Sequence, residues 1–188
     1  MSNQPVDQSR RTWVTMACAA GGAGGVATAI PFVSTFQPSE RAKAAGAAVE
    51  ADISALKPGE MMTVEWRGKP VWILKRTPEQ VAALKSIEPQ LADPDSERKP
   101  AELTPEYCRN TQRSIKDDVL VAVGICTHLG CSPSSKFQSG PQASLPDDWP
   151  GGFLCPCHGS TFDLAGRVFK NKPAPDNLEI PPHMYLSD

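Results

Sequence analysis

Two short segments constrain the fold of this chain more than any other feature, because they concentrate side chains that bind metals. The segments are Cys126-Thr127-His128-Leu129-Gly130-Cys131 and Cys155-Pro156-Cys157-His158-Gly159-Ser160. Together they contain four of the six cysteines and two of the three histidines. This concentration indicates a metal centre built from two loops that meet in space.

Cys126 and His128 in the first segment, with Cys155 and His158 in the second, offer two thiolates and two imidazoles. This donor set fits a tetrahedral zinc site, or a 2Fe–2S cluster in which two histidines replace two cysteines on one iron. The Cys-x-His spacing of the first segment is tighter than that of usual structural zinc ligands, which favours iron. One cysteine and one histidine per loop would then allow each loop to reach both irons.

Cys131 and Cys157 remain outside that set, one in each segment. We expect them to join the two loops by a disulfide and so hold the loops at a fixed separation. A disulfide also implies an oxidising compartment.

The paired segments resemble those of the Rieske iron–sulfur proteins of cytochrome bc complexes, the quinol–cytochrome c oxidoreductases. The resemblance covers most of the chain: an N-terminal anchor, both segments, and a downstream proline loop, Lys172-Pro173-Ala174-Pro175. It implies a mostly β fold, namely a Rieske-type antiparallel β sandwich with a small cluster-binding subdomain at about residues 125–175. One N-terminal transmembrane helix would complete the chain.

The resemblance also implies a function. The protein would carry one Rieske-type 2Fe–2S cluster and be a subunit of ubiquinol–cytochrome c reductase, a proton-translocating oxidoreductase. It would take one electron from ubiquinol and pass it to a c-type cytochrome subunit, within a dimeric complex. His158 corresponds to the histidine that faces the quinol, so we expect it to accept the hydrogen bond and the proton. Leu129, Gly130 and Pro173 would form an apolar tip that docks on the cytochrome b subunit. An alternative role for Leu129 is only to shield the cluster from water.

Two further residues are expected to tune the cluster. Ser160 corresponds to a serine that hydrogen-bonds a bridging sulfide in the family. Phe162 stands where the family commonly has a tyrosine that hydrogen-bonds a ligand cysteine. Because this donor is missing, we expect a lower reduction potential than in relatives with the tyrosine.

Composition narrows the remaining possibilities. The net charge of −2 and pI near 5.9 give no sign of a nucleic-acid-binding surface. Nineteen prolines against two tyrosines favour a loop-rich β fold over a helical bundle. We expect His183 to be a packing or surface residue, Cys108 a free or partly buried thiol, and Cys18 a packing residue, none of them a ligand.

The N-terminal region predicts export and anchoring. Residues 1–12 contain paired arginines, Arg10 and Arg11, that resemble a twin-arginine signal. Residues 13–36 carry no charge and would span about 36 Å as a helix, enough to cross a bilayer. Residues 37–49 are expected to be a flexible hinge, and residues 50–188 a periplasmic domain anchored by a single span in a bacterial inner membrane. A cleaved signal peptide is the alternative, because small-residue cleavage patterns follow the apolar run.

Local patterns predict several elements of the domain. Strands are expected at Met61–Arg67 and Pro70–Arg76 around a Gly68-Lys69 turn, and at 119–125 leading into the first loop. Thr77 should cap a short helix reaching about Ile87, with Gln80 completing a capping box. We expect residues 88–118 to be mostly loop, 132–152 to be a surface excursion, and 162–169 to form strand, turn and strand.

Other functions stay open at this point. The chain could be the small Rieske subunit of a periplasmic oxidase such as arsenite oxidase, which is also exported by the twin-arginine route. A soluble ring-oxygenase component fits less well, because those proteins lack the extra cysteine pair and need no export. A structural zinc module without electron transfer is the alternative from a different class.

Overall fold

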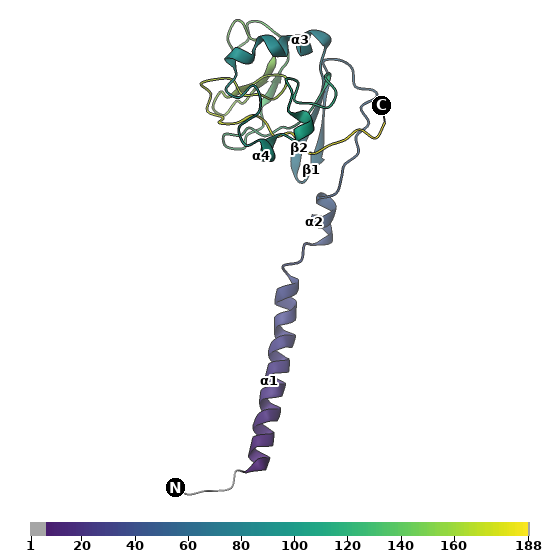
Figure 1. The fold of residues 1–188 in the computed structure, drawn as a ribbon, viewed down its shortest axis with the longest axis vertical. Helices are drawn as coiled ribbons and strands as arrows, with labels where there is room; N and C mark the ends of the chain where they lie inside the picture. The colour runs from purple at the N-terminus through teal and green to yellow at the C-terminus, as the bar shows by residue number, and fades with distance from the viewer. Residues whose placement is uncertain (1–6, 188) are drawn as a thin grey trace. The chain divides into compact units, whose positions relative to one another are not determined.

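The computed structural model describes residues 7–187, and the chain divides between Gly46 and Ala47 into two units. The first unit contains the helices α1 (Gln8–Ser34) and α2 (Glu40–Ala45), both drawn in Figure 1. The second unit contains the described strands, arranged in two antiparallel sheets of three. The predicted fold class is therefore confirmed: mostly β, with few helices in the domain and one apolar helix near the N-terminus.

Helix α1 is 27 residues long and contains an 18-residue window with a mean hydropathy of 1.5, which makes it long and apolar enough to cross a membrane. Asp7 caps it, because its carboxylate accepts hydrogen bonds from the backbone N–H groups of Ser9 and Arg10. The helix thus begins before the predicted span of residues 13–36 and includes the paired arginines. α2 lies inside the predicted hinge, residues 37–49, so this stretch is not wholly irregular.

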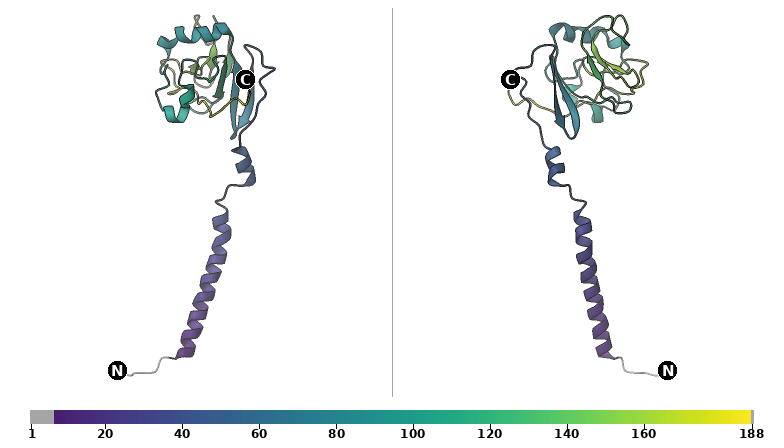
Figure 2. Two further views of the ribbon diagram at one scale, coloured as in Figure 1. Left: turned by 45° about the vertical axis from the view of Figure 1, so that its right-hand side comes forward. Right: turned by 180° about the vertical axis from the view of Figure 1, so that it is seen from behind.

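The first sheet has the order β1–β2–β3, with β1 at Met61–Trp66, β2 at Lys69–Lys75 and β3 at Val119–Val123. Arg67 and Gly68 form the two-residue turn between β1 and β2, and both have positive φ angles (52° and 71°). Paired positive φ angles match the twist of a tight hairpin. The predicted hairpin is confirmed, and its turn lies one residue earlier than predicted. The third strand, β3, is buried at all five of its residues. Figure 2 shows β1 and β2 with the C-terminal segment beside them.

Helix α3 (Pro78–Ser86) has the predicted capping box: Thr77 accepts from the backbone of Gln80, whose side chain bonds the backbone of Thr77. The following stretch is mostly irregular, as expected, with three short helices. They are η1 (Glu88–Gln90), α4 (Pro100–Leu103) and η2 (Glu106–Cys108).

The second sheet has the order β4–β5–β6, with β4 at Ser134–Lys136, β5 at Gly152–Leu154 and β6 at Thr161–Phe162. β4 and the buried Trp149 correct the prediction that residues 132–152 are only a surface excursion. The Trp149 ring packs on Phe169 at 5.5 Å and its Nε1 donates to the carbonyl of Lys136, so this segment covers part of the core. Phe162 forms an antiparallel β-bridge with Val168, which confirms the predicted strand, turn and strand.

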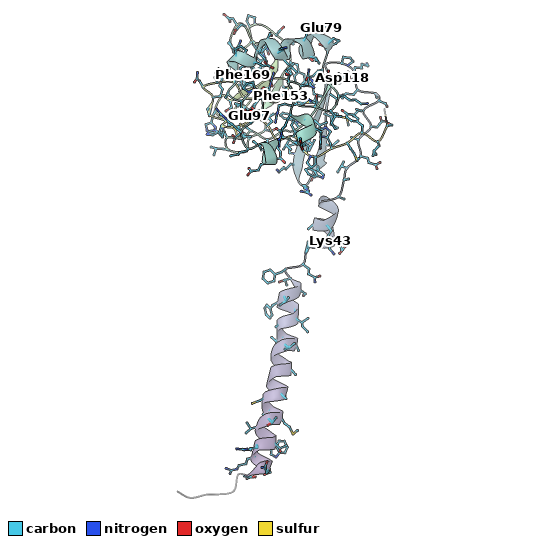
Figure 3. The ribbon with its side chains drawn as sticks, viewed as in Figure 1. Lys43, Glu79, Glu97, Asp118, Phe153 and Phe169 are labelled. Atoms are coloured by element: carbon cyan, nitrogen blue, oxygen red, sulfur yellow. A yellow bond between two sulfur atoms is a disulfide. The ribbon has the colours of Figure 1, made fainter. Side chains whose placement is uncertain are left out.

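Trp72 of β2 and Phe153 of β5 join the two sheets. Their rings stack with centroids 4.8 Å apart, and Figure 3 labels Phe153 among the packed side chains of the domain. Gly124, directly after β3, leaves room for this stack, since a Cβ there would lie 2.2 Å from the Trp72 ring. Packing of the core therefore requires a glycine two residues before the first cysteine–histidine loop.

Three fully buried arginines, Arg76, Arg113 and Arg167, hold the irregular segments of the domain together. The Arg113 guanidinium donates to Thr104 Oγ1 and to the carbonyls of Ala165, Gly166 and Leu178, at 2.7–3.2 Å. Burial lowers the pKa of Arg76 and of Arg113 to about 10, so both stay charged at neutral pH. Arg167 pairs with the buried carboxylate of Asp163 at 2.7 Å. These arginines replace the regular backbone hydrogen bonds that the loops lack.

Replacing Arg113 with methionine should lower the free energy of unfolding by ~3 kcal/mol, because several buried carbonyls lose their only charged donor. Denaturant unfolding of the purified chain, followed by circular dichroism, measures this. Arg98→Met is the matched control, since the Arg98 side chain is exposed and donates one hydrogen bond, to the Pro175 carbonyl. Equal stability of the two variants would contradict the role given to Arg113.

Candidate metal centre

The two cysteine–histidine loops adopt the same backbone turn. In each, the first cysteine donates its N–H to the carbonyl five residues later, and its own carbonyl accepts from the glycine four residues later. In the first loop, the N–H of Cys126 donates to the carbonyl of Cys131 at 2.8 Å, and the N–H of Gly130 donates to the carbonyl of Cys126 at 3.1 Å. In the second loop, the N–H of Cys155 donates to the carbonyl of Ser160 at 2.7 Å, and the N–H of Gly159 donates to the carbonyl of Cys155 at 3.0 Å. Both glycines have positive φ angles, 81° and 74°, which side chains disfavour. The loops are structural repeats of one another.

The sheets deliver both loops to one place. The buried strand β3 leads into Cys126, while β5 ends directly before Cys155 and β6 begins directly after Ser160. A disulfide between Cys131 and Cys157 joins the two loops covalently. The loops are therefore fixed to the core by strands and to each other by a bond.

The structure brings the two candidate histidines together and buries both candidate cysteines. Cys126 and Cys155 are buried free thiols, and the rings of His128 and His158 lie 4.8 Å apart at nearly right angles. Nδ1 of His128 is buried and has no hydrogen-bond partner among the described residues. An unpartnered buried ring nitrogen is costly, and coordination of a metal would satisfy it.

The environment of the thiols also suits a metal. Burial raises the pKa of the Cys126 thiol, as does the neighbouring Cys155, whereas the backbone N–H of His128 and the Ser160 hydroxyl lower it. Cys155 also lies within 4.8 Å of the sulfurs of Cys131 and Cys157, but these two form the disulfide and offer no thiolate. The available donors are therefore two thiols and two imidazoles, and a bound cation would stabilise the thiolates.

The proline loop closes the site by bonding to both cysteine–histidine loops. The N–H of Ala174 donates to Ser160 Oγ at 2.9 Å, and Thr127 Oγ1 donates to the carbonyl of Asp176 at 2.6 Å. Sequence reasoning assigned no role to Thr127 or Asp176. The Pro-Ala-Pro pattern signals a rigid loop, but no sequence signal tells which of its neighbours bond to the site.

The remaining predicted site residues occupy distinct places. Leu129 is 71% exposed, and Gly130 and Pro173 are also exposed at the surface. Phe162 is fully buried, in the same hydrophobic cluster as Cys126 and Cys155. Its phenyl ring offers no hydrogen-bond donor to either sulfur.

Within the domain, the remaining cysteine, Cys108, and the third histidine lie outside the centre, as expected. Cys108 is buried, and burial raises the pKa of its thiol to about 11, so it is an inert core residue. Cys18 lies on α1. His183 packs between the rings of Tyr107 and Tyr185, and its Nδ1 bonds the carbonyl of Pro181.

Comparison with known proteins identifies this centre. The Rieske [2Fe-2S] domain matches residues 104–182, which include both loops and the proline loop. The chain is 57% identical to the ubiquinol-cytochrome c reductase iron-sulfur subunit of Allochromatium vinosum, over all of this chain and 89% of that protein. It belongs to this family of Rieske subunits.

Two other relatives are similar over nearly their full length. The corresponding subunit of Rhodospirillum rubrum is 37% identical, over 97% of this chain and 90% of that one. A chain of the solved hyperthermophilic respiratory Complex III is 26% identical, over 92% of this chain and 94% of that chain, with a TM-score of 0.46.

The Rieske family decides between the two kinds of metal centre that the donor set allowed. The cofactor is a 2Fe–2S cluster, not a structural zinc ion. The residues present fit this cofactor, because the two disulfide-joined loops hold two buried thiols and two adjacent imidazoles, one of them with an unpartnered buried nitrogen.

Proposed function

We propose that this Rieske protein is the 2Fe–2S electron-transfer subunit of a quinol–cytochrome c oxidoreductase. It takes one electron from ubiquinol and passes it to a c-type cytochrome subunit, and His158 couples proton uptake to electron uptake. The observation that carries the proposal is the asymmetry of the site: the thiols of Cys126 and Cys155 are buried, whereas His158 is exposed beside His128.

The four candidate ligands have separate roles in this proposal. Cys126 and Cys155 hold one iron, and His128 and His158 hold the other. When bound, a cluster with two imidazole ligands accepts one electron at a higher potential than an all-cysteine cluster, as quinol oxidation requires. The buried thiols keep water from the sulfur side, and the disulfide keeps the loops at a constant separation when the charge changes.

His158 is the contact with substrate. Its exposed ring would accept a hydrogen bond from the hydroxyl of ubiquinol and would take up the proton at its outer ring nitrogen when the quinol is oxidised. His128 is half-buried and serves as a ligand. Ser160 donates its hydroxyl toward the sulfurs while accepting from the N–H of Ala174, which fixes its orientation.

The exposed side of the loops is the proposed docking tip. Leu129, Gly130 and Pro173 are exposed, on the first cysteine–histidine loop and on the proline loop, and they would dock on the quinol-binding face of a cytochrome b subunit. A dimeric complex with cytochrome b and a c-type cytochrome is the proposed assembly. The names of the relatives support one part of it, membership of a ubiquinol-cytochrome c reductase.

The N-terminal unit is proposed as the anchor. Residues 1–12 would stay in the cytoplasm with the paired arginines as export signal, residues 13–36 would span the inner membrane, and residues 37–49 would be the hinge. Residues 50–188 would then be periplasmic. The length and hydropathy of α1 support one span, and the disulfide fits an oxidising compartment.

Co-purification separates the proposed function from the periplasmic oxidase alternative. The full chain, affinity-tagged at its C-terminus and extracted in mild detergent, should retain b- and c-type haem and reduce cytochrome c with added ubiquinol. Difference absorption spectra measure the haems. Recovery with another redox enzyme and without b-type haem would contradict the assignment to a cytochrome bc complex.

The reduction midpoint of the protein should fall as pH rises through the alkaline range, because the reduced form keeps a proton on a ligand histidine that the oxidised form loses. For one proton per electron the slope is about 59 mV per pH unit. Redox titrations followed by circular dichroism measure it. His183→Gln should keep this dependence, since His183 lies outside the centre, and a flat midpoint in the unaltered protein would refute proton coupling.

Phe162→Tyr should raise the midpoint by roughly 60 mV, because a new hydroxyl beside the buried thiols adds one hydrogen bond to a charged sulfur. The same redox titrations measure the shift. Phe169→Tyr is the control, since Phe169 packs on Trp149 instead of on the thiols, and its midpoint should not change. A fall or no change in Phe162→Tyr would contradict the tuning role.

A further inference from the structure

An irregular segment, residues 93–99, is hydrogen-bonded to the end of the proline loop and to the residues that follow it. Asn177 is buried, and its Nδ2 donates to the carbonyl of Asp93 at 2.9 Å and to Ser96 Oγ at 3.1 Å. Arg98 donates to the carbonyl of Pro175 at 3.0 Å. These contacts join two segments that are far apart in the chain.

The segment is itself rigid. The buried carboxylate of Asp93 accepts hydrogen bonds from the backbone N–H groups of Glu97 and Arg98, at 2.9 and 3.0 Å. Figure 3 labels Glu97 on this part of the domain. The Asp93 turn therefore fixes the backbone that precedes Lys99.

An ion pair links this segment to the proline loop. Lys99 Nζ lies 3.0 Å from Asp176 Oδ2, and the side chain of Asp176 is only 11% exposed, against 58% for Lys99. The hydrogen bond and charge of Asp176 raise the pKa of Lys99, so the lysine stays protonated. A nearly buried carboxylate thus receives its compensating charge from an exposed amine.

The backbone of Asp176 also contacts the first cysteine–histidine loop. Its carbonyl accepts the hydroxyl of Thr127 at 2.6 Å, and Thr127 stands between the candidate ligands Cys126 and His128. Asp176 is therefore one hydrogen bond away from the loop that carries these candidate ligands, and its side chain is surrounded by little water that could screen its charge. Reduction adds one negative charge to the centre, so an uncompensated carboxylate here would oppose it.

We propose that Lys99 and Asp176 form a charge-balancing pair that sets the reduction potential of the metal centre. The proposal rests on the function proposed above, since it concerns the potential at which the centre accepts an electron. Lys99 cancels the field of the Asp176 carboxylate, whereas Asn177 and Arg98 hold the proline loop in place. The pair acts on the potential through charge and not by shaping the loops.

Three variants of the full, cluster-loaded chain test the sign of each charge. Lys99→Met should lower the reduction midpoint and Asp176→Asn should raise it. Each variant should change the equilibrium constant of reduction by about threefold to tenfold, and a tenfold change corresponds to 59 mV. The double variant should return close to the unaltered protein. If both single variants shift the midpoint in the same direction, or neither shifts it, the proposal is overturned.

Controls separate charge from structure. Lys99→Arg should keep the original midpoint, and Lys85→Met, which removes an exposed charge on α3, should shift it far less than Lys99→Met does. Hydrogen exchange of the Ala174 amide reports whether the proline loop stays bonded to Ser160. Its protection should be unchanged in Lys99→Met with or without bound iron, and loss of protection would assign Lys99 a structural role instead.

The same experiment separates this inference from the proposed function. If the chain lacks the electron paramagnetic resonance signal of a reduced histidine-ligated 2Fe–2S cluster, the proposed function fails. If the signal is present and the single variants do not shift in opposite directions, only the role of the pair fails.

Discussion

The metal centre depends on one constraint: two separate loops must present their donors to a common point and hold them there. Each loop meets it with a short turn in which the N–H of the first cysteine and the carbonyl of the same residue are both bonded inside the loop. The turn requires a glycine with positive φ at its fourth step, a conformation that other residues adopt only with strain. Because both loops repeat this turn, the disulfide that joins them connects two already shaped parts.

The rest of the domain serves to keep those loops from moving. Strands enter and leave them, and the Trp72–Phe153 stack joins the sheets directly behind. Where the chain is irregular, buried guanidinium groups supply the hydrogen bonds that a sheet would otherwise make. A guanidinium carries five donors in a fixed plane, so one arginine can satisfy carbonyls from several distant segments. This explains how a domain with so little regular structure remains well packed.

The sequence alone predicted the parts of the molecule that depend on local rules. The β1–β2 hairpin, the capping box of α3 and the buried strand β3 follow from neighbouring residues, and the structure has them all. The paired loops were predictable because their ligand types are rare and closely spaced. The two structural repeats, however, share only their first cysteine and their glycine, so the equivalence of Cys131 and Ser160 is visible only in the backbone hydrogen bonds.

What escaped sequence reasoning depends on contacts between distant segments. An arginine in a polar stretch usually lies at the surface, and nothing beside Arg113 in the chain indicates that its partners are 9 to 65 residues away. Trp149 similarly lies in a stretch of Ser, Pro and Gly that is typical of a loop, yet its ring completes the core. Lys99 and Asp176 are ordinary charged residues until the fold places them together.

Burial of the thiols and exposure of one histidine together resolve a conflict in any centre that gains an electron. A dry environment strengthens the bonds between sulfur and metal and excludes water, but it also makes an added charge costly. The protein places the thiols inside and leaves His158 at the surface, where, in the proposed mechanism, a proton arrives with the electron. The proposed Lys99–Asp176 pair extends the same solution, because its carboxylate lies inside and its amine outside. In this proposal, charge is compensated at the edge of the site while the interior stays dry.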